Sequence, residues 1–281
     1  MADFEEKLDA IATEIKGGTC VPFLGAAASV SSNGYKGPPT GTQLAKELAD
    51  ECGYPDDDIW NLPRVAQFYE YKEKRKGLID RLVGRILPYS EPSPIHILIS
   101  QIAKLGTIKC IITTNYDRLM EIALDRAGVA WMPFVQKPVD REAQAFFPPR
   151  GFSGPVLYKM HGTIQEPETV VITEDDYIEF LAALRSNDQG IPSNIPYYFT
   201  QYFSTCTLLF VGYGLEDWNF KVLFKGLIEK LPRHLKPTSY AIQKYPSDFL
   251  ENYWKQRGIE ILYLDVYEFA HKLAEKLGVG I

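Results

Sequence analysis

The chain has 281 residues, of which 46% are hydrophobic and 23% charged, and this length allows one large domain or two small ones. That composition is ordinary for a globular protein and excludes a disordered or fibrous chain. The 30 basic and 36 acidic residues leave a net charge of −6, which gives no overall footprint for nucleic acid. The longest apolar runs, at residues 108–113 and 207–212, have the length of strands, so we expect no membrane segment.

The amino terminus and the cysteines indicate a cytoplasmic protein. The first residues, Met-Ala-Asp-Phe-Glu-Glu, are acidic where a secretory signal needs a basic flank and an apolar stretch. The four cysteines lie at least 32 positions apart and form no Cys-x-x-Cys or Cys/His ligand spacing. Three of them, Cys20, Cys110 and Cys206, lie in or beside apolar strand-like runs, which is typical of buried inert thiols. We therefore expect no metal and no disulfide.

The predicted elements alternate between helix and strand along the chain. A helix over residues 4–16 is followed by a strand at 20–24, a turn of small residues at 25–29 and a helix around 43–48. Residues 60–105 predict helices that are broken at Gly77 and Pro88. The later strands are predicted at residues 108–114, 156–160, 207–211, 239–243 and 259–264, and the later helices at residues 118–127, 174–184, 197–203, 217–230 and 266–277.

The helical stretch carries a cluster of basic residues: Lys72, Lys74, Arg75, Lys76, Arg81 and Arg85. A basic cluster of this kind could touch nucleic acid. Glu70, Glu73 and Asp80 are interleaved with it, however, which favours a solvated helix face with ion pairs four positions apart. We expect no direct binding of nucleic acid.

This alternation predicts an α/β fold, a doubly wound parallel sheet of the Rossmann-like kind. We expect a single domain over residues 1–281, with a helical insertion at roughly 55–105 and a helical segment at roughly 174–205. In such sheets, ligands bind beyond the carboxyl ends of the strands.

Four glycine-rich or polar segments follow four of the predicted strands. They are residues 25–29, 114–117, 161–162 and 212–217. Each alone is weak support for a site, because a single turn of this kind or a single His-Gly pair is common. If the strands are parallel neighbours, all four tips meet at one crevice, with His161 and Asn115 exposed outside the core.

The same residues resemble the sirtuin superfamily, specifically the sirtuin-like NAD-cleaving domains of bacterial anti-phage systems, over roughly residues 18–230. The phosphate turn of that family is similar to Gly25-Ala26-Ala27-Ala28-Ser29, and its Thr-x-Asn-x-Asp element to Thr113-Thr114-Asn115-Tyr116-Asp117. The His-Gly pair of the family matches His161-Gly162, within Tyr-Lys-Met-His-Gly, and its later glycine-rich contact resembles Gly212-Tyr213-Gly214.

The resemblance implies a sirtuin-type fold and particular residue roles. The implied catalytic residues are His161, Asn115 and Asp117. The implied NAD-binding residues are Gly25, Ala26, Ala27, Ser29, Thr114, Gly212, Tyr213 and Gly214. An unperturbed imidazole with a pKa near 6.5 suits proton transfer, and an asparagine amide can hydrogen-bond the ribose and a water. For Asp117 the alternative is a cap of the helix at Arg118, and for the glycines it is a simple chain turn.

Two departures separate this chain from the acyl-lysine-removing members of the superfamily. Ala27 stands where the phosphate turn has its second glycine, which adds a methyl group at a close approach. Residues 163–205 contain no cysteine and no Phe-Gly-Glu element, so we expect no zinc module and no peptide clamp.

The resemblance implies an NAD+ glycohydrolase that releases nicotinamide and ADP-ribose and depletes NAD+ when a partner triggers it. We expect a homo-oligomer and a separate partner, either a DNA-translocating ATPase of the HerA type or an Argonaute-like protein. One alternative is an NAD-dependent protein deacylase or ADP-ribosyltransferase. Another is a subunit that senses NAD or ADP-ribose without turnover, which Ala27 favours.

Three histidines and one aromatic group have plainer explanations. The apolar helical context of His96 indicates a packed or hydrogen-bonded residue, and His234 and His271 are predicted at the surface. The aromatic group comprises Tyr197, Tyr198, Phe199, Tyr202 and Phe203. These residues could line a pocket or a subunit contact, but helical spacing in a core explains them equally well.

Overall fold

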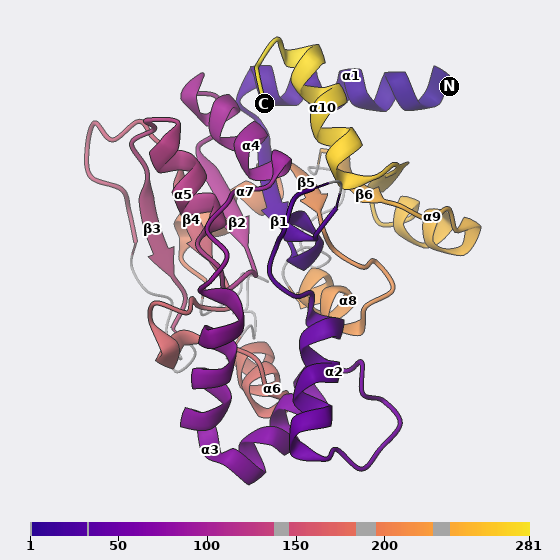
Figure 1. Cartoon of the computed structure of the whole chain (residues 1–281). Coiled ribbons are helices and arrows are strands. Elements are labelled where there is room, and N and C mark those ends of the chain that lie inside the picture. Colours follow the sequence, from indigo (N-terminus) through magenta and orange to yellow (C-terminus); the bar gives the residue numbers. More distant parts are fainter. Residues whose placement is uncertain (1, 33, 138–145, 184–194, 227–236) are drawn as a thin grey trace.

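Seven parallel strands form one sheet in the order β3-β4-β2-β1-β5-β6-β7 (Figure 1). The structure is a computed structural model that describes residues 2–32, 34–137, 146–183, 195–226 and 237–281. The strands are β1 (Cys20–Leu24), β2 (Cys110–Thr113), β3 (Met132–Val135), β4 (Val156–Lys159), β5 (Thr207–Val211), β6 (Ser239–Gln243) and β7 (Ile259–Tyr263). The chain runs outward from β1 to one side through β2 and then to the other through β5, so the sheet is doubly wound, as the sequence predicts.

Helices cover both faces of the sheet. The described helices are α1 (Ala2–Gly17), α2 (Gly41–Cys52), α3 (Leu62–Ile86), α4 (Pro94–Lys104), α5 (Leu119–Arg126), α6 (Glu174–Ala183), α7 (Tyr197–Thr205), α8 (Trp218–Phe224), α9 (Asp248–Lys255) and α10 (Val266–Leu277), with short 3₁₀ turns η1 (Ala26–Ser29) and η2 (Pro167–Thr169). None of the helices in these ranges is long and apolar enough to cross a bilayer.

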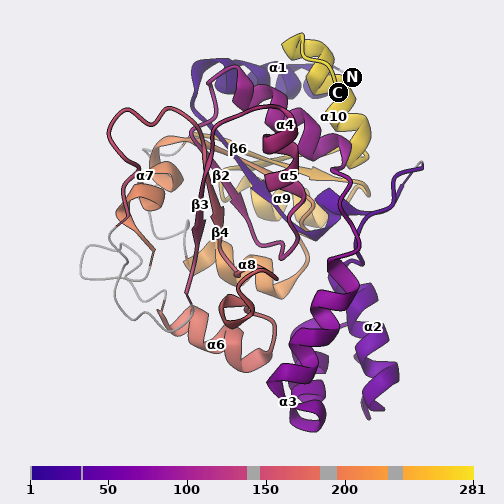
Figure 2. The ribbon, with the colours of Figure 1, turned by 60° about the vertical axis from the view of Figure 1, so that its left-hand side comes forward.

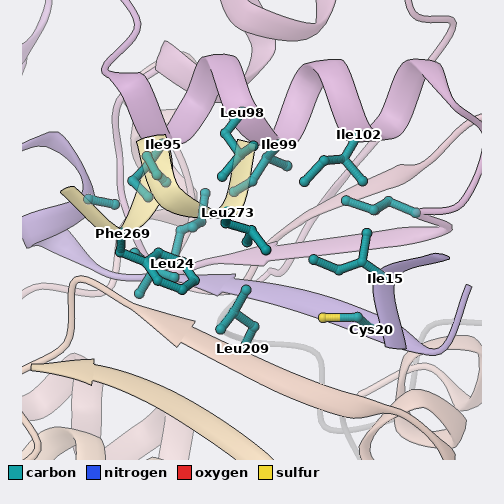
Figure 3. Packing of buried hydrophobic residues seen from close by; sticks show 14 of the residues in the cluster. Ile15, Cys20, Leu24, Ile95, Leu98, Ile99, Ile102, Leu209, Phe269 and Leu273 are labelled. Atoms are coloured by element: carbon teal, nitrogen blue, oxygen red, sulfur yellow. The ribbon is translucent and has the colours of Figure 1, made fainter. Parts of the chain in front are cut away.

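Side-chain alternation along the strands divides the core into two layers. Cys20 and Leu24 of β1 face a layer formed with α1, α4, α5 and α10, and Figure 3 shows Ile15, Leu98 and Leu273 packed there. Val21 and Phe23 of the same strand face the opposite layer, which α7, α8 and α9 cover. Strands buried on both faces explain the continuous apolar runs in the sequence.

A third, smaller core lies in a helical module that projects from the end of the sheet toward which β3 points (Figures 1 and 2). Helices α2 and α3 pack side by side in it, and Ile164, Val170 and Ile172 from the chain after β4 complete the core. Helix α3 is kinked at Lys74, where φ is +65°. The predicted break at Gly77 is therefore wrong by three residues, while the break before Pro88 is confirmed.

Four residues of the basic cluster, Arg75, Lys76, Arg81 and Arg85, form ion pairs. Arg85 pairs with Glu47 and Arg81 with Glu51, both on α2, and Arg75 pairs with Asp176 of α6 at 2.7 Å. Lys76 pairs with Asp80 four residues on. The predicted spacing of four positions is seen for Lys76 and Asp80, whereas Arg75, Arg81 and Arg85 pair with residues of other helices.

The sequence misses two elements. β3 is a four-residue edge strand containing Pro133, and an edge position tolerates a residue that lacks an N–H. Helix α9 begins after Ser247, whose side chain accepts a hydrogen bond from the Leu250 amide, a start signal that was readable in the sequence. The helix predicted over residues 217–230 is described only as α8, and its last four residues, like His234, lie outside the described ranges.

The smaller predictions for single residues mostly hold. All four cysteines are buried and none is bonded to another. His96 is 1% exposed and its Nδ1 accepts from the Ser93 amide, whereas His271 is exposed. In the aromatic group, Phe199 and Phe203 are buried core residues and Tyr197 is exposed, so helix packing explains most of that set.

Candidate active site

The four segments singled out in the sequence follow β4, β2, β1 and β5, which are four consecutive neighbours in the sheet. Their tips therefore lie along one edge, at the carboxyl ends of the strands. The winding direction reverses between β1 and β5, and such a switch point is where open α/β sheets bind ligands.

The tips of β1 and β5 are joined through their backbones. The Ala27 amide donates to the Gly212 carbonyl oxygen at 2.9 Å, and the Gly25 amide donates to the Val211 carbonyl oxygen at 2.9 Å. Gly212 has φ +84°, and a Cβ there would lie 2.2 Å from the Ala28 nitrogen. A glycine is required at this position by the fold itself, whatever ligand binds nearby.

The tip of β2 bonds to the tips of β1 and β5. The Asn115 amide nitrogen Nδ2 donates to the Gly25 carbonyl oxygen at 3.1 Å, which fixes the amide plane and leaves Oδ1 on its other side. The hydroxyls of Thr114 and Tyr213 lie 2.8 Å apart, and the Tyr213 hydroxyl donates to the Leu24 carbonyl oxygen at 2.9 Å. Tyr213 and Thr114 thus tie β1, β2 and β5 together.

Asp117 is buried behind this tip. Its Oδ1 accepts from the amide of Leu119, the first residue of α5, at 2.9 Å, and its Oδ2 accepts from the Ser29 hydroxyl at 3.4 Å. Burial raises the pKa of this carboxyl group, and the charge of Lys159 opposes that effect. Ser29 is fully buried, and its hydroxyl is directed to Asp117 rather than to the surface.

His161 lies at the tip of β4 beneath helix α6. Its imidazole is packed edge-on by the rings of Tyr177 and Phe180, with centroids 5.2 and 5.1 Å away. The residue is 6% exposed, and its Nε2 is buried without a hydrogen-bond partner among the residues that the structure describes. Burial lowers the pKa of the imidazole to about 3, so the ring is neutral at pH 7.

The structure brings the predicted residues to one edge but does not expose them as expected. Asn115 is half-buried, and the expectation that His161 is an exposed strand tip is wrong, because α6 folds over it. Of the turn residues, Ala26 is exposed and Ala27 half-exposed. Gly214 is exposed, and a Cβ there would meet only the Asp217 Cβ at 4.0 Å.

Sequence reasoning missed the side chains that cover and support the site. Tyr177 and Phe180 carry no recognisable signal, since their position over His161 depends on how α6 docks. Lys159 does carry one, because a lysine inside a strand buried on both faces is unusual.

Two cavities lie away from His161. One of about 290 Å³ is lined by Cys206, Ser239 and Arg257, and another of about 550 Å³ by Tyr35, Asp265 and His271. The carboxyl edge is closed over His161 in this conformation. Within the described ranges, no three His, Cys, Asp or Glu side chains group as they would around a metal ion.

The fold and the edge define a class of protein: a doubly wound α/β domain whose polar and glycine-rich tips lie at a ligand-binding switch point. A family model described as "SIR2-like domain" matches residues 109–262, more than half of the chain. The chain belongs to the SIR2-like domain family, which confirms the resemblance drawn from the motifs.

Individual relatives agree with this assignment. The chain is 26% identical over 231 residues to the "NAD(+) hydrolase ThsA" of Acinetobacter baumannii (strain 532279), covering 81% of this chain and 43% of that protein. It is 27% identical over 274 residues to "Defense-associated sirtuin 2" of Bacillus subtilis, covering 92% of this chain and 24% of that protein. The chain thus spans less than half the length of these curated relatives.

Among solved structures, the chain is similar to one titled "Sir2 bound to acetylated peptide". The TM-score is 0.48 with 17% sequence identity, and the match covers 99% of each chain.

Proposed function

We propose that this chain is an NAD+ hydrolase domain that cleaves the bond between nicotinamide and ribose, releases nicotinamide and ADP-ribose, and depletes NAD+ as a defence effector. One observation carries the proposal: the buried, unbonded Nε2 of His161 and the amide of Asn115 belong to adjacent strand tips beside a β1/β5 switch point in the described part of the chain. Relatives named as NAD(+) hydrolases and as a defence-associated sirtuin support it.

The residues present suit this chemistry. Loss of nicotinamide leaves a cation-like ribose carbon, and an attacking water must lose a proton. A neutral imidazole can take that proton, and the Nε2 of His161 has no hydrogen-bond partner among the described residues. Burial is what lowers the pKa of this ring, so its basicity recovers when the cover of α6 is displaced. The fixed amide of Asn115 offers Oδ1 to the ribose or the water, and orienting both reactants is itself a large part of catalysis.

The closed edge implies that substrate entry involves helix α6. Tyr177 and Phe180 pack directly against the His161 ring, so a ribose on that side of the ring would have to displace them. The helix is anchored to the helical module, because Asp176 bonds Arg75 and the Asp175 amide donates to the Gln67 side chain. We propose that a partner or a homo-oligomer in the cytoplasm shifts this helix, with an ATPase or an Argonaute-like protein as the candidate partner.

The test is incubation of the purified protein with NAD+, alone and with the product of the adjacent gene, followed by chromatography for nicotinamide and ADP-ribose. We expect both products in equal amounts. Tight nucleotide binding without nicotinamide under every condition would instead select a sensing subunit. Acceleration by an acylated peptide would select a deacylase. Light scattering of the same samples reports the oligomeric state.

A further inference from the structure

Lys159 is a charged side chain in the interior of the sheet, directly before the tip that carries His161. It belongs to β4, between β2 and β3, and is 2% exposed. Removing an ammonium group from water is costly unless its protons are well paired. The hydrogen bonds that the ammonium forms therefore show which parts of the protein Lys159 holds in place.

The ammonium bridges the strand tip of β2 and helix α5. Nζ donates to the main-chain oxygen of Asp117 and, at 3.0 Å, to Oε1 of Glu121. Glu121 is 4% exposed, and its second oxygen, Oε2, is buried with no hydrogen-bond partner in the described ranges. The pair is thus incompletely satisfied, with one carboxylate oxygen left unbonded.

An incompletely satisfied buried ion pair is a poor device for stability. Replacement of such a pair by apolar side chains of similar volume is often neutral or stabilising, because the desolvation of both charges is avoided. The pair instead orients the backbone, because the Lys159 ammonium donates to the carbonyl of Asp117 from inside the sheet. That carbonyl lies two residues after Asn115, in the short segment between β2 and α5.

The same segment is held from its other side. The Asp117 carboxylate accepts from Ser29 of η1, and the Asn115 amide donates to Gly25. Lys159 supplies the side-chain contact from β4, so the β2 tip is fixed between the tips of β1 and β4. Loss of that contact would leave the Asp117 carbonyl without the buried donor that now holds it.

We propose that Lys159, together with Glu121, is a positioning residue: it fixes the β2 tip so that Asn115 and His161 keep one mutual arrangement. The activity side of this proposal rests on the function proposed above. The structural side does not, because it concerns the backbone of residues 114–118 in the protein without ligand.

The main test variant removes both charges at once, Lys159→Met with Glu121→Leu, so that no unpaired charge stays buried. We expect a melting temperature within about 4 °C of the parent protein. We expect kcat for NAD+ to fall about 10-fold or more with KM changed less than about 3-fold, because a small displacement of a catalytic group costs rate more than binding. Lys159→Gln with Glu121→Gln also removes both charges but keeps an N–H donor at position 159, so it should give a smaller effect in the same direction.

A matched control is the exposed pair of Arg126 and Glu91, which joins the same helix α5 to the chain before α4 at 2.7 Å. Arg126→Gln with Glu91→Gln should leave the melting temperature, kcat and KM unchanged, since exposed pairs contribute little. A loss of activity in this control would mean that α5 in general, rather than Lys159, governs the tip.

Hydrogen exchange separates a failure of this proposal from a failure of the proposed function. Amides of residues 114–119 should exchange about 10-fold faster in the Lys159→Met/Glu121→Leu protein than in the parent, while β5 stays protected. If the parent releases no nicotinamide, the proposed function fails and exchange still decides the positioning role. Unchanged exchange at residues 114–119 overturns the proposal, and so does a collapse of the melting temperature in both of the variants that remove the two charges.

Discussion

The ring of Tyr177 packs edge-on against the imidazole of His161, with the two centroids 5.2 Å apart. Tyr177 comes from α6 and His161 from the end of β4, so one helix covers the imidazole at the carboxyl edge. The tyrosine is only half-buried, whereas Phe180 on the same helix is 1% exposed. Tyr177 is therefore the part of this cover that can be removed with the least damage to the core.

Tyr177→Ala should uncover His161 and raise kcat/KM for NAD+ about 3- to 10-fold, because a larger fraction of the protein is then open to the substrate. Initial rates of nicotinamide release measure this. Ile178→Ala is the matched control on the same helix, since Ile178 is 63% exposed and should leave the rate unchanged. A fall in kcat/KM for Tyr177→Ala would show that the phenol helps to bind the substrate.

His161→Asn and Asn115→Ala should each lower NAD+ cleavage about 100-fold or more, because each removes a group assigned to the water or the ribose. Asparagine is chosen at 161 because alanine would leave a cavity under α6 at this buried position. Circular dichroism and melting curves check the fold, and His271→Asn, an exposed histidine, is the control. Near-normal turnover in either variant would remove that residue from the mechanism.

The stability of the protein should fall in acid because two histidines are buried in the neutral form. Burial lowers the pKa of both His96 and His161 to about 3. The unfolded chain binds their protons below about pH 6.5 and the folded chain does not, so the free energy of unfolding decreases as the pH falls from about 6.5. Each histidine accounts for about 2 kcal/mol between about pH 7.5 and pH 5.

Melting curves between about pH 7.5 and pH 5 test this effect. His96→Gln, which keeps an acceptor for the Ser93 amide, should remove about half of the pH dependence. Asp117 acts in the opposite direction, because its raised pKa lets the folded state take up a proton earlier than the unfolded chain. A melting temperature that stays constant down to about pH 5 would contradict burial of neutral imidazoles.

Gly212→Ala should destabilise the protein by about 3 kcal/mol or more, since the new Cβ would meet backbone at a positive φ. Gly84→Ala in α3 is the control, because its added Cβ would meet no described atom within 4 Å apart from its chain neighbours and the backbone of its own helix. That change should be neutral or stabilise by about 0.5–1 kcal/mol. Urea unfolding of both proteins measures the difference, and equal stabilities would mean that the β1 and β5 tips are not interlocked through Gly212.

Ala27→Gly should be tolerated and should tighten nucleotide binding, because it removes a methyl group from the turn after β1. The amide of residue 27 keeps its bond to the Gly212 carbonyl in either case. Titration calorimetry with ADP-ribose measures the affinity. A clear loss of binding would mean that this turn does not face the phosphates.

Most of the sheet could be predicted from the sequence. The apolar runs at β1, β5 and β6 predict those strands with their observed bounds, because a strand buried on both faces needs continuous apolar side chains. The edge strand β3 could not be found in the same way, since a short strand with one open edge and a proline has no such pattern.

The sequence by itself determined which residues are candidates for the chemistry, because glycine turns, the Thr-Thr-Asn-Tyr-Asp element and the His-Gly pair are local patterns of residue type. Only the tertiary structure decided that β4, β2, β1 and β5 are neighbours, that Lys159 reaches Asp117 from inside the sheet, and that α6 covers His161. Those relations join residues far apart in the chain, and they depend on how helices and strands dock, a property that no local pattern encodes.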